Sequence, residues 1–200
     1  MKSRIVIIGS GGHALSCSEV ITKEKKFRIA GFVDKKNINI KPYKIIGNDN
    51  DLIKLRKKYN YAFIGIGQIK SPLKRKNIFT KLKKMKFILP KIISKSSLVS
   101  KKSFIDEGTI IMNFSHININ SRIGKACIIN TGSNIEHDVN VGDFVHISTG
   151  AIINGNAKIG SYSFIGSGSV IHNGIKIGEN CIVGAGKVIK RNLKSFSIIK

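Results

Sequence analysis

The sequence predicts an α/β domain with a parallel sheet followed by a parallel β-helix, and two features of the chain indicate this order. An apolar run at residues 4–8 leads directly into a glycine-rich turn, residues 9–14 (GSGGHA), which is typical of a Rossmann-like domain. From Ile93 to Ile189, Ile or Val then occupies every sixth position without a miss. We therefore divide the chain into a Rossmann-like domain, residues 1–90, and a β-helix domain, residues 91–200, with Pro90 at the boundary.

Apolar stretches and turn signals define the elements of the first domain. Continuous apolar runs are typical of buried parallel strands, and they predict strands at residues 4–8, 27–33, 61–66 and 87–89. The helical segments are expected from the glycine-rich turn to about residue 25, from a cap at residues 47–49 to about residue 58, and, as a basic amphipathic stretch, at residues 72–84. A loop containing Pro42 joins the second strand to the second helix.

The second domain is predicted from its period of six, which fits neither an α-helix nor a free strand. It fits a prism with three flat faces, in which three hexapeptides close one coil of 18 residues. A second set of mostly small or aliphatic residues lies four positions after each Ile or Val, so both positions are expected to point inward. Glycine recurs once per coil, where a Cβ is expected to clash at a corner, at Gly124, Gly142, Gly160 and Gly178. The hexapeptide pattern, not the period itself, indicates a left-handed β-helix.

Net charge, apolar runs and cysteines limit the classes of ligand and the cellular compartment that we expect for this protein. The net charge of +24 is compatible with nucleic-acid binding, but the lysines are spread along the chain, aromatic residues do not alternate with them, and no binding motif is present. We rank nucleic acid last and expect the basic surface to favour phosphate-bearing small molecules such as coenzyme A. No apolar run approaches the ~20 residues of a membrane span. The three cysteines, two of them at small inward positions, predict buried thiols in a reducing, bacterial-type cytoplasm.

The first domain offers a place for a nucleotide. A glycine-rich turn between a strand and a helix presents backbone N–H groups and the positive end of the helix dipole to an anion. Asp34 ends the next strand, about 20 positions after the turn, where an acidic residue is expected to accept hydrogen bonds from a ribose or base. The competing interpretation is an NAD-binding domain, but the second domain offers no site for hydride transfer.

The phase of the β-helix points to one histidine cluster. His137 and His146 occupy outward positions, so neither is a core histidine. His137 lies between Glu136 and Asp138, and a carboxylate partner fixes the tautomer of a general base. Because the two histidines are half a coil apart, they are expected to meet only across a subunit boundary, and three packed prisms form a closed arrangement.

A metal site is the alternative interpretation of the histidines. The gamma-class carbonic anhydrases share a hexapeptide β-helix and bind zinc through three histidines. His116, His137, His146 and His172 do not show that spacing, so no metal is expected. His116 and His172 are expected to be surface residues.

Motifs along nearly the whole chain carry a family resemblance. They are GSGGHA at residues 9–14, FVD at 32–34, IGIG at 64–67, IEHDV at 135–139, VGDFVH at 141–146 and VGAG at 183–186. With them the chain resembles the sialic acid O-acetyltransferase and UDP-bacillosamine-type sugar N-acetyltransferase family of hexapeptide-repeat acyltransferases.

The resemblance implies an arrangement of sites in a homotrimer. Acetyl-CoA would lie in the groove between neighbouring β-helices, with His137 as general base and Asp138, or alternatively Glu136, orienting it. The implied acetyl-CoA contacts are His146 near the thioester, Gly155, Ser167 and Ala185. A backbone N–H near Gly155 would stabilise the thioester oxyanion. The implied nucleotide-sugar contacts are Gly11, Gly12, His13 and Asp34.

The leading functional prediction is acetyl-CoA-dependent transfer of an acetyl group to the amine of a nucleotide-linked amino sugar, of the UDP-4-amino-sugar type, in surface glycan biosynthesis. The alternatives are O-acetylation of a sialic-acid-like sugar and a non-catalytic sugar-binding or scaffold protein. Two departures from the family pattern bear on this. Lys35 replaces a second acidic residue that would favour uridine, and Lys187 stands where a small residue is usual.

Overall fold

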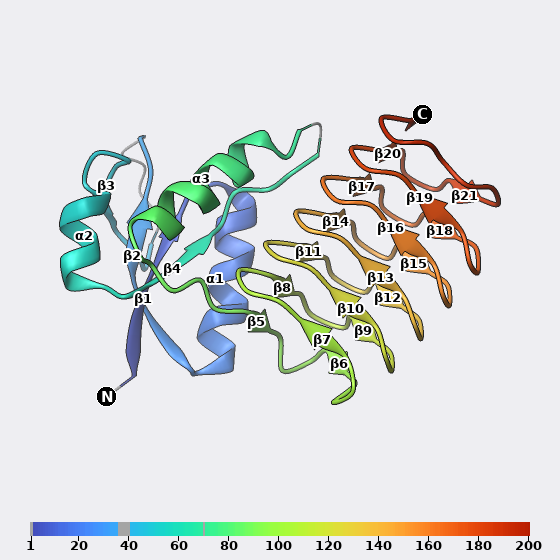
Figure 1. The fold of residues 1–200 in the computed structure, drawn as a ribbon. Helices are drawn as coiled ribbons and strands as arrows, with labels where there is room; N and C mark the ends of the chain where they lie inside the picture. The colour runs from blue at the N-terminus through green and yellow to red at the C-terminus, as the bar shows by residue number, and fades with distance from the viewer. Residues whose placement is uncertain (1, 36–40, 70) are drawn as a thin grey trace.

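The computed structural model describes residues 2–35, 41–69 and 71–200, and it has two parts that differ in architecture (Figure 1). The first part is a three-layer α/β domain. Its parallel sheet has the order β3-β2-β1-β4, formed by β1 (Ser3–Ile8), β2 (Phe27–Val33), β3 (Ile45–Gly47) and β4 (Tyr61–Ile64). The helices are α1 (Gly12–Glu24), α2 (Leu52–Lys58) and α3 (Leu73–Lys84). Helix α1 packs against one face of the sheet, and α2 and α3 pack against the opposite face.

The predicted parallel sheet is confirmed, with differences at two short segments. Residues 45–47, expected within a loop, form the edge strand β3, and α2 begins at Leu52 rather than directly after residue 49. The predicted strand at residues 87–89 is wrong as a full strand, because only Ile88 pairs, as an isolated bridge to Tyr61. Both segments lie at sheet edges, where one or two backbone contacts decide the assignment and an apolar pattern is a weak guide.

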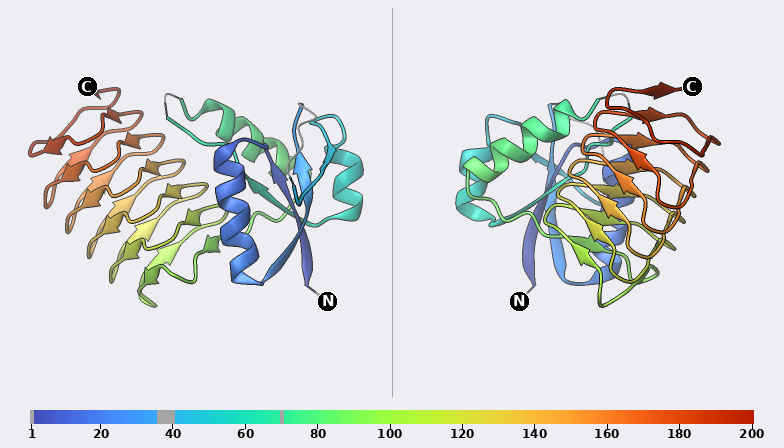
Figure 2. Two further views of the ribbon diagram at one scale, coloured as in Figure 1. Left: turned by 180° about the vertical axis from the view of Figure 1, so that it is seen from behind. Right: turned by 45° about the vertical axis from the view of Figure 1, so that its right-hand side comes forward.

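The second part is a left-handed parallel β-helix of two-residue strands on three faces (Figure 2). The domain face, which adjoins the first part, contains β5 (Ile92–Ile93), β8 (Ile110–Ile111), β11 (Ile128–Ile129), β14 (His146–Ile147), β17 (Phe164–Ile165), β20 (Ile182–Val183) and β22 (Ile198–Ile199). The uncharged face contains β6 (Leu98–Val99), β9 (His116–Ile117), β12 (Asn134–Ile135), β15 (Ile152–Ile153), β18 (Val170–Ile171) and β21 (Val188–Ile189). The basic face contains β7 (Phe104–Ile105), β10 (Arg122–Ile123), β13 (Asn140–Val141), β16 (Lys158–Ile159) and β19 (Lys176–Ile177).

The repeat of Ile and Val forms the axis of the prism, as predicted. The second residue of each strand points inward, and these side chains make one continuous core with small residues such as Cys127, Ala151 and Cys181. Glycine at the corner is required by the spacing of the coils. A Cβ on Gly160 would lie 2.5 Å from the carbonyl carbon of Gly178, one coil further on, closer than any side chain tolerates.

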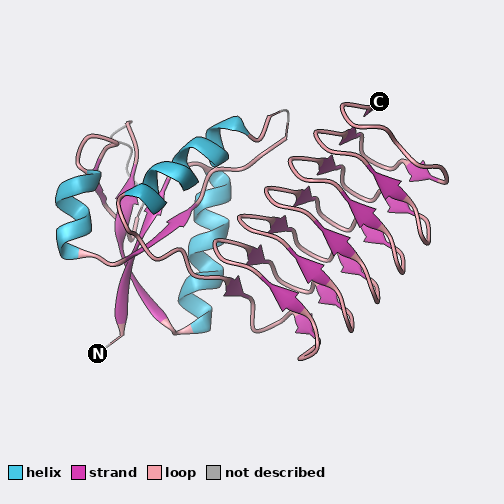
Figure 3. Ribbon diagram, viewed as in Figure 1, coloured by secondary structure: helices cyan, strands magenta, loops and turns pink. Residues whose placement is uncertain are grey.

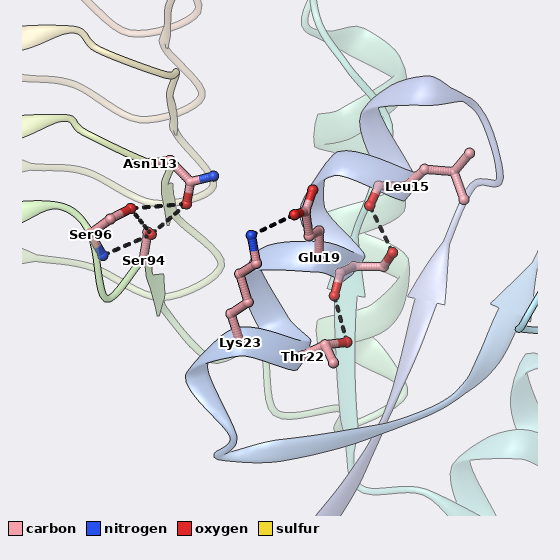
Figure 4. Close-up of polar contacts among 8 residues, drawn as sticks. Leu15, Glu19, Thr22, Lys23, Ser94, Ser96 and Asn113 are labelled. Atoms are coloured by element: carbon pink, nitrogen blue, oxygen red, sulfur yellow. Dashed lines mark hydrogen bonds and ion pairs between the residues drawn. The ribbon is translucent and has the colours of Figure 1, made fainter.

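Helices are confined to the first domain (Figure 3), and α1 covers the first coils of the domain face. The outward side chains of Ile92, Ile110 and Ile128 are buried there. Figure 4 shows polar contacts on α1 and on the first coils beside it, including the exposed pair of Lys23 and Glu19 at 2.6 Å.

Two side chains of the first domain reach further along the prism and fix the domains together. The buried guanidinium of Arg75 on α3 donates to the carbonyl oxygen of Ile64 at the end of β4, to that of Ile66 in the following loop, and to that of Ala126 in the β-helix. Gln68 Nε2 donates to the carbonyl oxygen of Phe144 at 2.6 Å. The loop after β4 is therefore held against two successive coils.

Candidate active site

His137 stands at the corner between the uncharged and basic faces, in the turn from β12 to β13. Its side chain is 53% exposed, and its Nδ1 lies 2.8 Å from Asp138 Oδ2. The hydrogen bonds from His137 and from Asn120 hold the pKa of Asp138 below its usual value, so this carboxylate is ionised and accepts the Nδ1 proton. That tautomer leaves the lone pair on Nε2, which is the arrangement a general base requires.

Glu136, the other carboxylate beside His137, is bound elsewhere. Its two oxygens accept hydrogen bonds from Asn118 Nδ2 at 2.9 Å and Asn134 Nδ2 at 2.8 Å. These bonds, first from Asn118 and then from Asn134, lower the pKa of Glu136. Of the two partners that the sequence left open for His137, the structure therefore pairs it with Asp138.

His146 lies on the domain face and is only 6% exposed. It points out of the prism, as predicted, but the loop after β4 covers it. Its Nδ1 donates to the carbonyl oxygen of Gln68, and its Nε2 accepts from Asn130 Nδ2 at 3.3 Å. Burial lowers the pKa of His146 to about 4, so the imidazole is neutral at pH 7.

His146 belongs to a cavity of about 580 Å³ at the junction of the two domains. The cavity is lined by His13, Gly67, Gln68, Ile69, Asn130, His146, Ser148, Phe164 and Ser167. Burial, with the nearby charge of Arg75 as a second cause, lowers the pKa of His13 to about 3. The cavity thus carries two neutral imidazoles and the hydroxyl groups of Ser148 and Ser167, whose oxygens are 2.9 Å apart. Ile69 and Phe164 add an apolar surface, so the lining combines uncharged polar groups with apolar side chains, as is common in small-molecule sites.

A second cavity, of about 370 Å³, opens at the carboxyl end of the parallel sheet. It is lined by Ile8, Gly9, Val33, Asp34, Lys35, Asp49, Ile66, Lys74, Asn77 and Ile78. Ser10 Oγ donates to Asp34 Oδ2 at 2.7 Å. Gly11 and Gly12, at the start of α1, have open space where a side chain would be. Ligands of open α/β sheets bind at this edge, next to the helix N-terminus.

The structure therefore distributes the predicted site residues over three places in one chain. His13, His146 and Ser167 share the junction cavity, and Ala185 lies in the exposed turn one coil beyond Ser167, with its backbone against Gly166. Gly11, Gly12 and Asp34 belong to the sheet edge. His137, Asp138, Glu136 and Gly155 occupy a different corner of the prism from the junction cavity.

Sequence reasoning missed several residues that line the two cavities, among them Gln68, Asn130, Lys74 and Asn77. Gln68 follows the IGIG strand end directly, so its place at the carboxyl edge of the sheet was a usable signal. Asn130 gave no such signal, because its place depends on how the two domains pack together. Lys74 and Asn77 gave none because they depend on how α3 packs beside the sheet edge.

In residues 2–35, 41–69 and 71–200, no group of three or more His, Cys, Asp or Glu side chains is placed to hold a metal ion. Within the same ranges, no helix has the length and apolarity needed to cross a membrane.

Comparisons with known proteins agree with this architecture. Residues 4–82 match the PglD N-terminal domain family, and residues 156–191 match the bacterial transferase hexapeptide (six repeats) family. No curated protein sequence matches the chain.

Solved structures match over almost the whole chain. PerB from Caulobacter crescentus, solved with CoA and GDP-perosamine, is 31% identical with a TM-score of 0.93, covering 98% of this chain and 93% of that chain. A histidine-to-asparagine variant of perosamine N-acetyltransferase from the same organism, also with CoA and GDP-perosamine, is 30% identical with a TM-score of 0.93 over 98% and 92%. The acetyltransferase domain of PglB from Neisseria gonorrhoeae FA1090, with acetyl coenzyme A, is 26% identical with a TM-score of 0.91 over 97% and 94%. With this identity and coverage, the chain belongs to the hexapeptide-repeat family of sugar N-acetyltransferases.

Proposed function

We propose that the protein transfers an acetyl group from acetyl-CoA to the amine of a nucleotide-linked amino sugar. The single observation that carries the chemistry is the exposed pair of His137 and Asp138, in which Nδ1 is bound and Nε2 is left to accept a proton. The relatives solved with CoA and GDP-perosamine support the choice of both substrates.

The proposed reaction is direct transfer. The amine nitrogen of the sugar attacks the thioester carbonyl carbon of acetyl-CoA, and His137 Nε2 takes the proton that the amine loses as the C–N bond forms. The C–S bond then breaks, and the CoA thiolate leaves and is protonated. Asp138 keeps the tautomer and stabilises the imidazolium. We place the oxyanion against the backbone N–H of Gly155 and the thioester near His146.

We place the nucleotide in the sheet-edge cavity. The backbone of Gly11 and Gly12 would bind the diphosphate at the N-terminus of α1, and Asp34 would accept hydrogen bonds from the ribose or base. Lys35 and Lys74 line this cavity and supply positive charge for the phosphates. The first domain, residues 1–90, then delivers the sugar, and the β-helix, residues 91–200, carries the transfer.

We propose further that the protein is a homotrimer whose subunits meet through the uncharged face. The outward side chains of this face include no Lys, Arg, Asp or Glu; they are Leu98, His116, Asn134, Ile152, Val170 and Val188. Leu98 is 69% and Val188 is 53% exposed in the single chain. In a chain of net charge +24, an uncharged strip with exposed apolar side chains favours a protein contact.

Packing of neighbouring subunits through the uncharged face would also assemble a complete active site. The two edges of this face carry different parts of the site: His137 is in a turn at one edge, and Ser148 and Ser167 are in turns at the other. Packing the uncharged faces of neighbouring subunits would bring His137 of one subunit toward the junction cavity of the next. Acetyl-CoA would then lie in the groove between them, against Ser167 and Ala185.

The test is release of free thiol from acetyl-CoA in the presence of UDP-linked amino sugars, GDP-linked amino sugars and free sialic-type sugars. Turnover with a nucleotide-linked amino sugar, lost in His137→Ala with the melting temperature unchanged, is the expected result. Turnover only with free sialic-type sugars would replace this proposal with O-acetylation, and binding without thiol release would replace it with a sugar-binding role. The three buried free thiols, Cys17, Cys127 and Cys181, suit the bacterial-type cytoplasm in which we place the reaction.

A further inference from the structure

One corner of the prism carries a column of residues in which a single side chain is missing. The second residue after each strand of the uncharged face recurs once per coil, at Lys101, Ile119, His137, Gly155, Asn173 and Arg191. Only Gly155 lacks a side chain.

The backbone does not account for this glycine. In these turns the left-handed conformation falls on the following residue, at Asn120, Asp138 and Asn156, and Gly155 itself is not left-handed. An L-residue therefore fits the conformation of Gly155, as it does at Ile119 and His137.

The space above Gly155 is occupied by the imidazole of His137, from the preceding coil. A Cβ on Gly155 would lie 2.7 Å from both Cε1 and Nε2 of His137, and 3.3 Å from Cδ2. The backbones of the two coils cannot separate easily, because Asn156 N donates to the carbonyl oxygen of His137 at 3.0 Å and Gly174 N donates to that of Gly155 at 2.9 Å. The half-exposed ring is the part that would have to move.

We propose that Gly155 is a positioning residue for the general base: its missing side chain provides the space in which the His137 imidazole is held. This inference rests on the proposed role of His137. The ring then has two fixed points, the Asp138 carboxylate at Nδ1 and the surface of Gly155 beside Cε1 and Nε2. Any larger residue at 155 turns Nε2 away from the amine while leaving the coil in place.

The experiment compares Gly155→Ala, His137→Ala and the double variant in steady-state acetyl transfer, with Asn173→Ala as a control one coil further along the same column. We expect Gly155→Ala to lower kcat about 100-fold, the loss typical of a misplaced reacting group, with the KM for acetyl-CoA within about twofold of wild type. Asn173→Ala should retain wild-type kcat. In the His137→Ala background, adding Gly155→Ala should leave the residual rate unchanged, because no imidazole remains to be displaced. A crystal structure of Gly155→Ala should show the ring rotated away from residue 155.

Three results would overturn the proposal in distinguishable ways. Wild-type kcat in Gly155→Ala, or an unmoved ring in its crystal structure, would show that the imidazole does not need the space. A raised KM for acetyl-CoA in both backgrounds would mean that the glycine serves the cofactor instead. Full turnover of His137→Ala would remove the proposed base, and with it the role of Gly155. The double variant lacks the clash, so it also separates the effect on the ring from a general folding defect.

Discussion

Replacing Arg75 with methionine is expected to lower the melting temperature by about 6–12 °C. The guanidinium is 1% exposed and donates to three carbonyl oxygens, those of Ile64, Ile66 and Ala126. Methionine keeps much of the volume but leaves all three acceptors without their donor. Each buried acceptor left unsatisfied costs about 1–3 kcal/mol.

Part of this loss is offset, because the variant also removes a buried charge. Burial lowers the pKa of Arg75 to about 10, so it remains a cation at pH 7, and its Nε has no hydrogen-bond partner among the residues that the structure describes. Removing a buried cation recovers its desolvation energy. We therefore take a net loss of about 3 kcal/mol, at the low end of the sum of the three bonds, and each kcal/mol corresponds to about 2–4 °C in a domain of this size.

The assay is thermal unfolding followed by circular dichroism at one fixed protein concentration, because the proposed assembly would make the melting temperature depend on concentration. Arg75→Lys keeps the charge but not the planar fork, so it is expected to lose most of the same stability. The control is Lys23→Met on α1, whose exposed pair with Glu19 contributes at most about 1 kcal/mol. A loss below about 2 °C in Arg75→Met would refute the reasoning, because the three bonds would then be no stronger than the desolvation they require.

Three other predictions concern the buried carboxyl group of Glu24, the partner of His137 and the proposed subunit interface. Burial raises the pKa of Glu24, so the folded state binds its proton more tightly than the unfolded state. Its contribution to stability is present below the unfolded pKa and is lost as the pH rises, so Glu24→Gln should raise the melting temperature at pH 7 and not at pH 4. Asp138→Asn should lower kcat about 100-fold or more with little change in either KM, which steady-state kinetics measures; an unchanged kcat would assign the orientation of His137 to another group. Val188→Asp on the uncharged face should dissociate the proposed trimer, as measured by light scattering coupled to gel filtration, whereas Lys158→Asp on the basic face should not. A trimer that survives Val188→Asp would place the interface elsewhere.

The sequence predicted the β-helix well, because its inward positions are set by the local period. Ile135 and Ile147 are core residues by phase alone, and no distant contact can change which way they point. The same phase placed His137 and His146 correctly outside the prism. It did not predict that Gln68 covers His146, because that contact joins two residues 78 positions apart and depends on how the two domains dock.

The partner of His137 is a second case in which the sequence left the answer open. Glu136 and Asp138 are each one residue away, so spacing cannot distinguish them. Glu136 is bound by Asn118 from the preceding coil and by Asn134 on its own strand, and this leaves Asp138 to the imidazole. The contact with Asn118 follows from the stacking of coils, which brings together residues 18 positions apart, so it could not be read from neighbouring positions in the sequence.

The two tethers between the domains contact the prism at equivalent positions of successive coils, Ala126 and Phe144. Both acceptors are backbone carbonyl groups, and every coil presents the same group at that corner, about 4.8 Å further along. The hydrogen bonds alone would therefore be satisfied equally well if the first domain were shifted by one coil along the β-helix in either direction. The side chains distinguish one coil from the next. Phe79 of α3 contacts Phe144 edge-on, with ring centroids 5.3 Å apart. The Phe79 ring also lies beside Gly108, where the absence of a side chain leaves it room. These aromatic contacts, together with the short connection to β5, determine which coils of the repetitive β-helix the first domain contacts.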